Sequence, residues 1–358
     1  MTQFSYEYEK KLKVGYIGAG EHSFRNILPC FQYAPIELVA LADTDTERGL
    51  AVARQFGARH FYPNHKAMLA KEEMDAVMIV AGPDAEGRPT PELAADALRA
   101  GFHVWFDTPP CARRADVSTL TQACMRKGKW AVAGFKRMHA PMYNKVADII
   151  ATPEFGGVTS FSMRYPVFMP AAEQLADDAA MLPFLEMLHP YSLLVRLFGE
   201  ARGVMYMRNE KSGGAILNFR YRNGVIGTLH LTAGQSATSP LERLEVIGNG
   251  GNVVVENASR LIYYRPGSFR GKGDIGREET FIGADATAPI IWEPEFSLGQ
   301  LYNKAIFLQG YVGAVRYFAE QILTNTPPKL GNLVDVLHMM ILFDKIRAGK
   351  ENDYIEVY

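Results

Sequence analysis

Short apolar segments alternate with helical segments throughout the first third of the chain, and this alternation limits the fold more than any other feature. Residues 13–20, 36–43 and 76–82 have the length and apolar content of buried strands. A segment with helical character follows each of them. Apolar strands that alternate with helices are typical of a parallel sheet covered on both faces. The sequence therefore predicts a doubly wound α/β sheet here.

The third of these helical segments shows clear boundary signals. Thr90 is suited to cap a helix over residues 90–101, Pro91 suits its first turn, and Gly101 suits its end. Further apolar strands are expected over residues 103–107 and at the "WAVAGF" segment. The predicted sheet therefore continues to about residue 135.

A glycine-rich turn follows the first expected strand. Residues 18–23 read GAGEHS and match G-x-G-x-x-G except that Ser23 replaces the third glycine. Gly18 permits a tight turn, and Gly20 lets the backbone approach a pyrophosphate at the start of the next helix. A strand before the motif and a helix after it strengthen a motif that is weak alone. The turn indicates a dinucleotide site that includes Ala19; the alternative is a purely structural turn.

Asp43 closes the second expected strand, as the acidic residue of a dinucleotide site would. Its carboxylate is suited to bind ribose hydroxyls and would repel a 2′-phosphate, and no arginine immediately follows it. The sequence therefore favours NAD over NADP. Glu21 is an unfavourable neighbour for a phosphate unless its side chain turns outward. His22 is either a phosphate contact or, as we favour, an exposed loop residue.

The pattern of residue types changes after about residue 150, where residues with strand propensity and hairpin turns predominate. Asn223-Gly224 indicates a tight turn between two strands, and a second hairpin is expected to turn at residues 249–251. Alternating apolar and polar residues predict a large open, mostly antiparallel sheet. Helices are expected over residues 179–200, 311–325 and 333–349. Residues 265–294 are expected to form an irregular loop.

A chain of 358 residues is too long for one ordinary core. We expect a nucleotide-binding α/β domain over residues 1–135 and an α+β domain for substrate and self-association over residues 136–358. The C-terminal helices are allowed to pack back on the first domain. An open sheet with one uncovered face favours a homodimer or homotetramer.

The composition excludes several classes of protein. A net charge of −1 gives no electrostatic footprint for nucleic acid. The apolar runs are too short to cross a membrane, and the N-terminal residues lack the apolar core of a signal peptide. Three scattered cysteines predict reduced thiols in the cytoplasm. His60 and His65 form at most a loose pair, so we expect no metal site.

The order of these segments resembles the glucose–fructose oxidoreductase, inositol dehydrogenase and MocA-like (Gfo/Idh/MocA) family. The matching pieces include VGYIGAG, ELVALADTD, PELAADALRAGFHVWFDTPP, VAGFKRMHAPMYNK, EMLHPYSLLVRLFGE and GYVGAVRYFAEQI, in the order of the family. The resemblance implies a Rossmann domain, a second domain with a large open sheet, and NAD(P)-dependent oxidation or reduction of a sugar, cyclitol or similar polyol.

The resemblance also assigns residues, and one of them departs from the family. The Glu-Lys-Pro triplet of the family aligns with Asp107-Thr108-Pro109, so the lysine is missing. The family's histidine on the second-domain helix aligns with His189. An acidic residue often follows it by three positions, where this chain has Ser192.

Glu186 and His189 are three residues apart on an expected helix and therefore share a face. A carboxylate beside an imidazole holds a defined tautomer, which suits a general acid or base. Structural packing of His189 is the alternative. Pro109 restricts its loop, and its peptide bond is a candidate for the cis form.

Two side chains are candidates to replace the family's lysine. Thr108 keeps a hydroxyl but supplies no charge, whereas Lys136 lies at the mouth of the last strand of the nucleotide domain, where family members border the substrate. An ordinary surface lysine is the alternative for Lys136. Arg137 beside it is suited to bind a carboxylate or phosphate group, or to pair with Asp148.

Further contacts are expected, among them Tyr191, whose ring is suited to stack on a sugar or, equally, to pack in the core. Cofactor contacts are expected from Gly18, Ala19, Gly20, Glu21, His22, Asp43, Gly82, Asp107 and Pro109, and substrate contacts from Arg137, Arg164, Tyr191 and Ser192. Three functions stay open: a sugar dehydrogenase or ketoreductase, an enzyme that oxidises its substrate only transiently with NAD tightly bound, and a nucleotide-binding regulatory protein without catalysis.

Overall fold

The structure is a computed structural model, and the part of it described below comprises residues 8–82, 90–111, 113–175, 177, 181, 184–266, 288–294 and 305–358. The chain folds as two compact units. The first unit consists of two segments, the chain up to His139 and Ala305–Asp344. The second unit begins at Ala140 and includes Lys345–Tyr358. Each unit contains one sheet.

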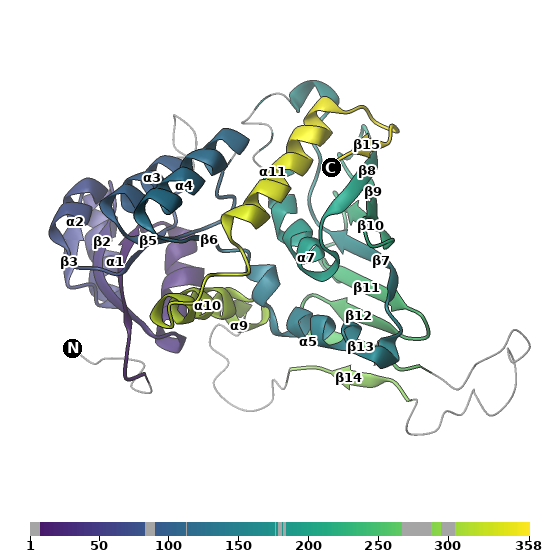
Figure 1. Ribbon diagram of the computed structural model, residues 1–358, viewed down its shortest axis with the longest axis horizontal. Coiled ribbons are helices and arrows are strands. Elements are labelled where there is room, and N and C mark those ends of the chain that lie inside the picture. The colour runs from purple at the N-terminus through teal and green to yellow at the C-terminus, as the bar shows by residue number, and fades with distance from the viewer. Residues whose placement is uncertain are drawn as a thin grey trace, which may run out of the picture. The chain divides into compact units, whose positions relative to one another are not determined.

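The first unit contains a six-stranded sheet in which every neighbouring pair is parallel, in the order β3-β2-β1-β4-β5-β6 (Figure 1). Its strands are β1 (Leu12–Ile17), β2 (Ile36–Ala42), β3 (His60–Tyr62), β4 (Ala76–Ile79), β5 (His103–Phe106) and β6 (Ala131–Ala133). Strand β4 is buried at every position, as a central parallel strand covered on both faces should be. The predicted doubly wound sheet is confirmed.

Helices cover both faces of this sheet (Figure 1). On one side α2 (His65–Lys71), α3 (Thr90–Ala100) and α4 (Arg114–Lys127) contact one another in succession. On the other side α10 (Tyr311–Leu323) contacts η1 (Ser23–Ile27) and η2 (Leu28–Tyr33). The other described helices of this unit are α1 (Thr46–Phe56), η3 (Lys136–His139), α9 (Ala305–Leu308) and most of α11 (Leu333–Ala348). The expected end of α3 at Gly101 is present, with φ of +97°.

The helix expected after the glycine turn differs from the prediction. It consists of a π-helical turn, η1 (Ser23–Ile27), followed directly by a 3₁₀ helix, η2 (Leu28–Tyr33). Pro29 stands in the first turn of η2 and has no backbone N–H to continue an α-helical ladder. The change of helix type at this point is the consequence.

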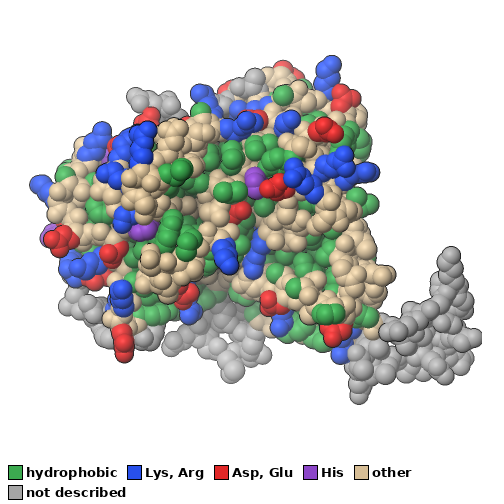
Figure 2. Space-filling view, viewed as in Figure 1, with side chains coloured by type: hydrophobic (Ala, Val, Ile, Leu, Met, Phe, Trp, Pro, Cys, Tyr) green, Lys and Arg blue, Asp and Glu red, His purple; other side chains and the backbone are tan. Residues whose placement is uncertain are grey.

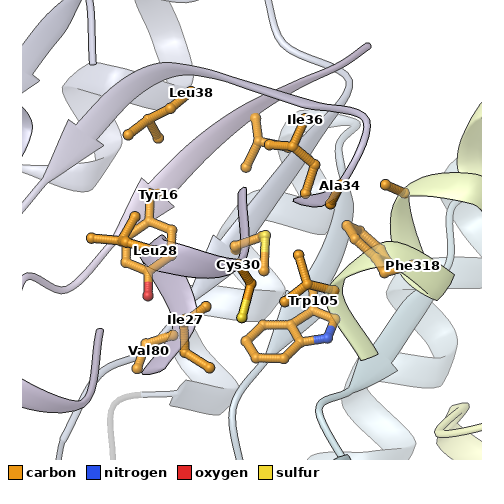
Figure 3. Close-up of a cluster of buried hydrophobic side chains, with 14 of the residues drawn as sticks. Tyr16, Ile27, Leu28, Cys30, Ala34, Ile36, Leu38, Val80, Trp105 and Phe318 are labelled. Carbon is orange, nitrogen blue, oxygen red and sulfur yellow. The ribbon is translucent and has the colours of Figure 1, made fainter. Parts of the chain in front are cut away.

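Apolar side chains from the sheet, η1, η2 and α10 form the core of the first unit. Figure 3 shows Tyr16, Ile27, Leu28, Trp105 and Phe318 meeting in one cluster. Each of the five is at most 1% exposed. Burial of a large apolar side chain contributes about 1.5–3 kcal/mol, so this cluster fixes α10 against the sheet.

The second unit contains a nine-stranded sheet in the order β14-β13-β12-β11-β7-β10-β9-β8-β15. Its strands are β7 (Val158–Tyr165), β8 (Ala201–Arg208), β9 (Ala215–Tyr221), β10 (Ile226–Leu231), β11 (Arg243–Gly248), β12 (Asn252–Glu256), β13 (Arg260–Tyr264), β14 (Ile290–Trp292) and β15 (Ile355–Glu356). Among the described strands of this sheet, β7 and β10 pair in parallel and the other neighbours are antiparallel. The predicted mostly antiparallel sheet is confirmed.

The structure tests two expected features of this sheet, a tight turn and a long loop. Asn223-Gly224 makes the expected turn between β9 and β10, with Gly224 at a φ of +89° that favours glycine. The expected loop over residues 265–294 is wrong at its end, because β14 pairs there with β13. Residues 267–287 lie outside the described residues.

The helices of the second unit are α5 (Pro141–Ile150), η4 (Pro153–Phe155), η5 (Ala172–Gln174), η6 (Phe184–Met187) and α7 (Leu188–Phe198). Helix α5 packs on β12. In α7 the side chains of Leu188, His189 and Tyr191 are all buried, and Gly199 caps the end of this helix. Pro190 is tolerated because it stands in the first turn of α7.

Candidate active site

The glycine turn requires glycine at one position and leaves space at another. Gly18 has a φ of +100°, and a Cβ there would lie 2.1 Å from the carbonyl oxygen of Val80. At Gly20 a Cβ would meet no heavy atom within 4 Å. The hydroxyl of Ser23 donates to the carbonyl of Gly18 at 2.8 Å. Ser23 thus closes the turn where the usual motif has a third glycine.

The side chains of the turn leave the approach to Gly20 open. Glu21 is 76% exposed and pairs with Arg25 at 2.9 Å, so it points outward as the sequence requires. His22 is partly exposed. Its Nε2 lies 3.2 Å from Oδ2 of Asp107, and its Nδ1 lies 3.1 Å from Nδ2 of Asn26. His22 therefore links the turn to the end of β5.

Asp43 is the buried support of the turn. It is only 8% exposed, and its Oδ2 accepts the backbone N–H of Ala19 at 2.5 Å. Its Oδ1 accepts the amide of Asp45 and Nη2 of Arg48, both at 2.8 Å. A carboxylate has about four acceptor positions. The donors named here use three of them, so Asp43 keeps the capacity to accept from one more group. Sequence reasoning missed Arg48, which stands five residues after Asp43 and not directly behind it.

The altered triplet lies at the carboxyl end of β5. The Thr108–Pro109 peptide bond is cis, which confirms the expectation for Pro109. Pro109 is buried, whereas the side chains of Asp107 and Thr108 are partly exposed. Gly82, which follows β4, is exposed and has no heavy atom near a built Cβ.

These residues fit a dinucleotide. The space beside Gly20 admits a phosphate to the backbone, and the outward Glu21 leaves that space free of negative charge. Asp43 stands at the end of the second strand, where a ribose is bound in this type of fold. Ligands of open α/β sheets lie at the carboxyl ends of the strands. Gly82 and Asp107 stand at those ends.

Lys136 is the first residue of η3, immediately beyond β6, and it is half-buried. Its Nζ donates to the hydroxyl of Tyr311 at 2.6 Å and lies 4.5 Å from the centre of the tyrosine ring. Arg137 beside it is 8% exposed, so its guanidinium is largely inside the unit. Sequence reasoning found Lys136 but gave no sign of Tyr311.

His189 and Glu186 belong to the second unit. Nε2 of His189 lies 3.3 Å from Oε2 of Glu186, as their spacing predicts. The imidazole is 8% exposed and the carboxylate 50% exposed. The pair therefore has one buried member that can hold a proton and one member that reaches solvent.

Three of the expected substrate contacts have partners within the second unit. Tyr191 is fully buried, its ring lies stacked on Phe219, and desolvation raises the pKa of its hydroxyl well above the usual value. Ser192 is fully buried and donates to the carbonyl of His189 at 2.8 Å. Arg164 is part-buried and donates to the carbonyl of Pro240. Tyr191 and Ser192 therefore have packing contacts in the structure, and their expected contact with a substrate stays a prediction.

The two histidines weighed as metal ligands have separate partners. His60 pairs with Glu72 at 2.8 Å and His65 with Asp96 at 3.0 Å. Within the described residues no group of three or more histidine, cysteine or carboxylate side chains is arranged to hold a metal ion.

Comparison with known proteins identifies the family. The model of the GFO_IDH_MocA oxidoreductases, described as an NAD-binding Rossmann fold, matches residues 12–135. A dTDP-3,4-didehydro-2,6-dideoxy-alpha-D-glucose 3-reductase of Streptomyces violaceoruber is 30% identical over 44% of this chain and 45% of its own length. The enzyme of the same name from Actinomadura kijaniata is 26% identical over 96% of this chain and 97% of its own.

The fold has close neighbours among solved structures. A dehydrogenase from Chromobacterium violaceum superposes with a TM-score of 0.78 at 21% identity, over 95% of both chains.

The chain spans about half the length of some of the curated relatives it matches. Over residues 12–135 it belongs to the Gfo/Idh/MocA oxidoreductase family.

On the face drawn in Figure 2, basic and acidic side chains are interspersed over the described residues. Within the described ranges, no helix combines the length and apolar content of a bilayer-spanning segment.

Proposed function

We propose that the protein transfers a hydride between NAD and a hydroxyl or ketone carbon of a sugar or sugar-like ring. The observation that carries this proposal is the glycine turn held by Asp43 through Ala19, with open space at Gly20. Membership of an NAD-binding oxidoreductase family supports the cofactor class. The names of the matched 3-reductases support a carbohydrate substrate.

The residues of this chain divide the proton chemistry among them. His189 takes the hydroxyl proton when an alcohol is oxidised and returns it to the oxygen when a ketone is reduced. Glu186 stabilises the imidazolium that forms. The ammonium of Lys136, assisted by the hydroxyl of Thr108, stabilises negative charge on the reacting oxygen. When bound, the nicotinamide accepts or supplies the hydride, so the carbon loses or gains two electrons.

We further propose NAD as the preferred cofactor. Asp43 is a buried carboxylate, and a 2′-phosphate next to it would be repelled. Arg48 reduces that repulsion because it pairs with both Asp43 and Asp45. We therefore expect a moderate preference for NAD and measurable binding of NADP.

Two wider statements belong to this proposal. The open face of the nine-stranded sheet, which includes part-exposed Asn218 and Thr228 and exposed Ile226, suits self-association into a dimer or tetramer. The three cysteines are unpaired thiols, which suits the reducing cytoplasm.

The test begins with the cofactor and then turns to substrate. Quenching of protein fluorescence would measure the dissociation constants of NADH and NADPH. Absorbance of the reduced nicotinamide would then follow turnover with dTDP-linked keto sugars and with free sugars. Cofactor binding with turnover of a carbohydrate supports the proposal. Product without net change in nicotinamide would indicate transient oxidation, and binding without turnover of any sugar would overturn it.

A further inference from the structure

We propose that Tyr311 is a positioning residue that fixes the ammonium group of Lys136, so that this lysine carries the positive charge that Thr108 lacks. The inference rests on the proposed function. It adds a residue that lies 175 positions from Lys136 in the sequence and outside the family's lysine motif.

Tyr311 contacts Lys136 in two ways. Its hydroxyl oxygen accepts a hydrogen bond from Nζ at 2.6 Å, a short distance for an N–H donor. Its ring centre lies 4.5 Å from the same nitrogen, within the range of a cation–π contact. A lysine side chain has many rotamers, and two contacts to one rigid ring restrict the nitrogen to a small region.

Tyr311 is itself fixed by its surroundings. It is the first residue of α10 and only 7% exposed. Its ring meets the ring of His22 edge-on, with 5.7 Å between centroids, and His22 pairs with Asp107. Tyr311 therefore lies beside the glycine turn and the end of β5, the edge of the sheet where ligands of this fold bind.

A glycine lets α10 approach the segment that carries Lys136. A Cβ at Gly313 would lie 2.7 Å from the carbonyl oxygen of His139, the last residue of η3. Any larger residue would push the first turn of α10 away from η3. The close approach is what places the Tyr311 hydroxyl within reach of Lys136.

The chemistry of the pair suits a charge that must act on another group. A phenol is neutral near neutral pH, so it accepts a hydrogen bond without cancelling the charge of the ammonium. An ammonium has three N–H donors, so the same group can donate to more than one oxygen. A fixed, charged donor aimed at developing negative charge is the usual basis of oxyanion stabilisation.

The experiment compares Tyr311→Phe, Lys136→Met and the double variant with a matched control, Tyr317→Phe. Tyr317 lies on the same helix, and its hydroxyl accepts the backbone N–H groups of Lys329 and Leu330. Its loss removes hydrogen bonds from α10 without touching Lys136. Limited acetylation with site-resolved mass spectrometry would measure the reactivity of Lys136 in the resting protein, relative to the exposed Lys66. NADH affinity, kcat and KM would be measured for each variant.

We expect Tyr311→Phe to increase acetylation of Lys136 about threefold or more and to lower kcat about tenfold, with NADH affinity changed less than about twofold. In the Lys136→Met background the same change should lower kcat no further. Tyr317→Phe should alter neither the acetylation of Lys136 nor kcat. Unchanged acetylation of Lys136 in Tyr311→Phe would overturn the inference, as would unchanged or fully additive effects on kcat. If wild-type protein turns over no sugar, the proposed function fails, and the acetylation rate alone decides whether Tyr311 positions Lys136.

Discussion

The backbone N–H of Ala19 donates to Oδ2 of Asp43 across 2.5 Å, and this bond joins the glycine turn to the end of β2. The same carboxylate holds Arg48 and the amide of Asp45. Asp43 is therefore a support of the turn, and we propose that it is also the acidic group that faces a bound ribose.

Replacing Asp43 tests both roles. Asp43→Asn loses the charge and weakens hydrogen bonds to charged partners, which are worth about 1.5–3 kcal/mol each. We expect NADH affinity to fall about tenfold or more, and NADPH affinity to fall less because the repulsion of a 2′-phosphate disappears. Fluorescence titration with both cofactors measures the change. Equal losses for the two cofactors would refute the role of Asp43 in selecting NAD.

Gly18 and Gly20 should respond differently to alanine. Gly18→Ala places a Cβ 2.1 Å from Val80 O at a φ of +100°, so we expect a loss of about 2–4 kcal/mol in the free energy of unfolding. Gly20→Ala meets no neighbour in the chain, so its stability should change by less than about 1 kcal/mol while NADH affinity falls about tenfold. Urea unfolding and NADH titration separate the two effects. A stable Gly18→Ala protein would contradict the geometry of the turn.

His103 makes the first unit sensitive to acid. Desolvation, and then the charge of Lys129, lower its pKa to about 4 against the opposing effect of Asp75, and its Nδ1 accepts the N–H of Trp130. Because the folded-state pKa lies below the unfolded value of about 6.5, the unfolded chain binds a proton first as pH falls. Stability should therefore decline between about pH 6.5 and about pH 4.

His103→Asn removes this titration and keeps a possible acceptor. Between neutral pH and about pH 5, the free energy of unfolding of wild type should fall. That of the His103→Asn variant should fall by about 1–2 kcal/mol less. Urea unfolding over a pH series measures the slope. His230→Asn, at an exposed histidine, should leave the slope as in wild type. Identical slopes for wild type and His103→Asn would show that another group controls acid unfolding.

The sequence alone predicts those parts of the fold that depend on short-range rules. Gly18 and Gly20, Asp43 at a strand end, and the turn at Asn223-Gly224 each follow from the conformational needs of a few neighbouring residues. The exception at η1 and η2 is also local, since it depends on Pro29, but helical periodicity does not distinguish π and 3₁₀ turns from an α-helix.

The parts that could not be predicted depend on contacts between distant residues. Tyr311 meets Lys136 only because α10 returns to the first unit, and no periodicity in either segment encodes that meeting. Tyr191 was expected at a ligand because tyrosine often stacks on sugars, but the helix buries it against Phe219. Arg48 reaches Asp43 only once α1 has formed.

The missing lysine of the Asp107-Thr108-Pro109 triplet gives a direct comparison. If Lys136 already supplies the charge, Thr108→Lys should not raise turnover in the wild-type background. The same change should restore about tenfold or more of the turnover lost in Lys136→Met. Thr119→Lys, at an exposed threonine of α4, is the matched control and should restore none. Steady-state assays of the four variants measure this. A gain from Thr108→Lys in the wild-type background would mean that Lys136 does not fill the lysine's place.

The most direct test of the central claim is the rate at which enzyme-bound NADH reduces a keto sugar in wild type and in His189→Gln. We propose that the imidazole gives its proton to the oxygen in this direction, and loss of a general acid costs about 10²–10⁴-fold. A single-turnover measurement with saturating NADH removes cofactor binding from the comparison. We predict rapid oxidation of NADH by wild type and a rate lower by about that factor in His189→Gln, with NADH affinity unchanged. Equal rates in the two proteins would contradict the account.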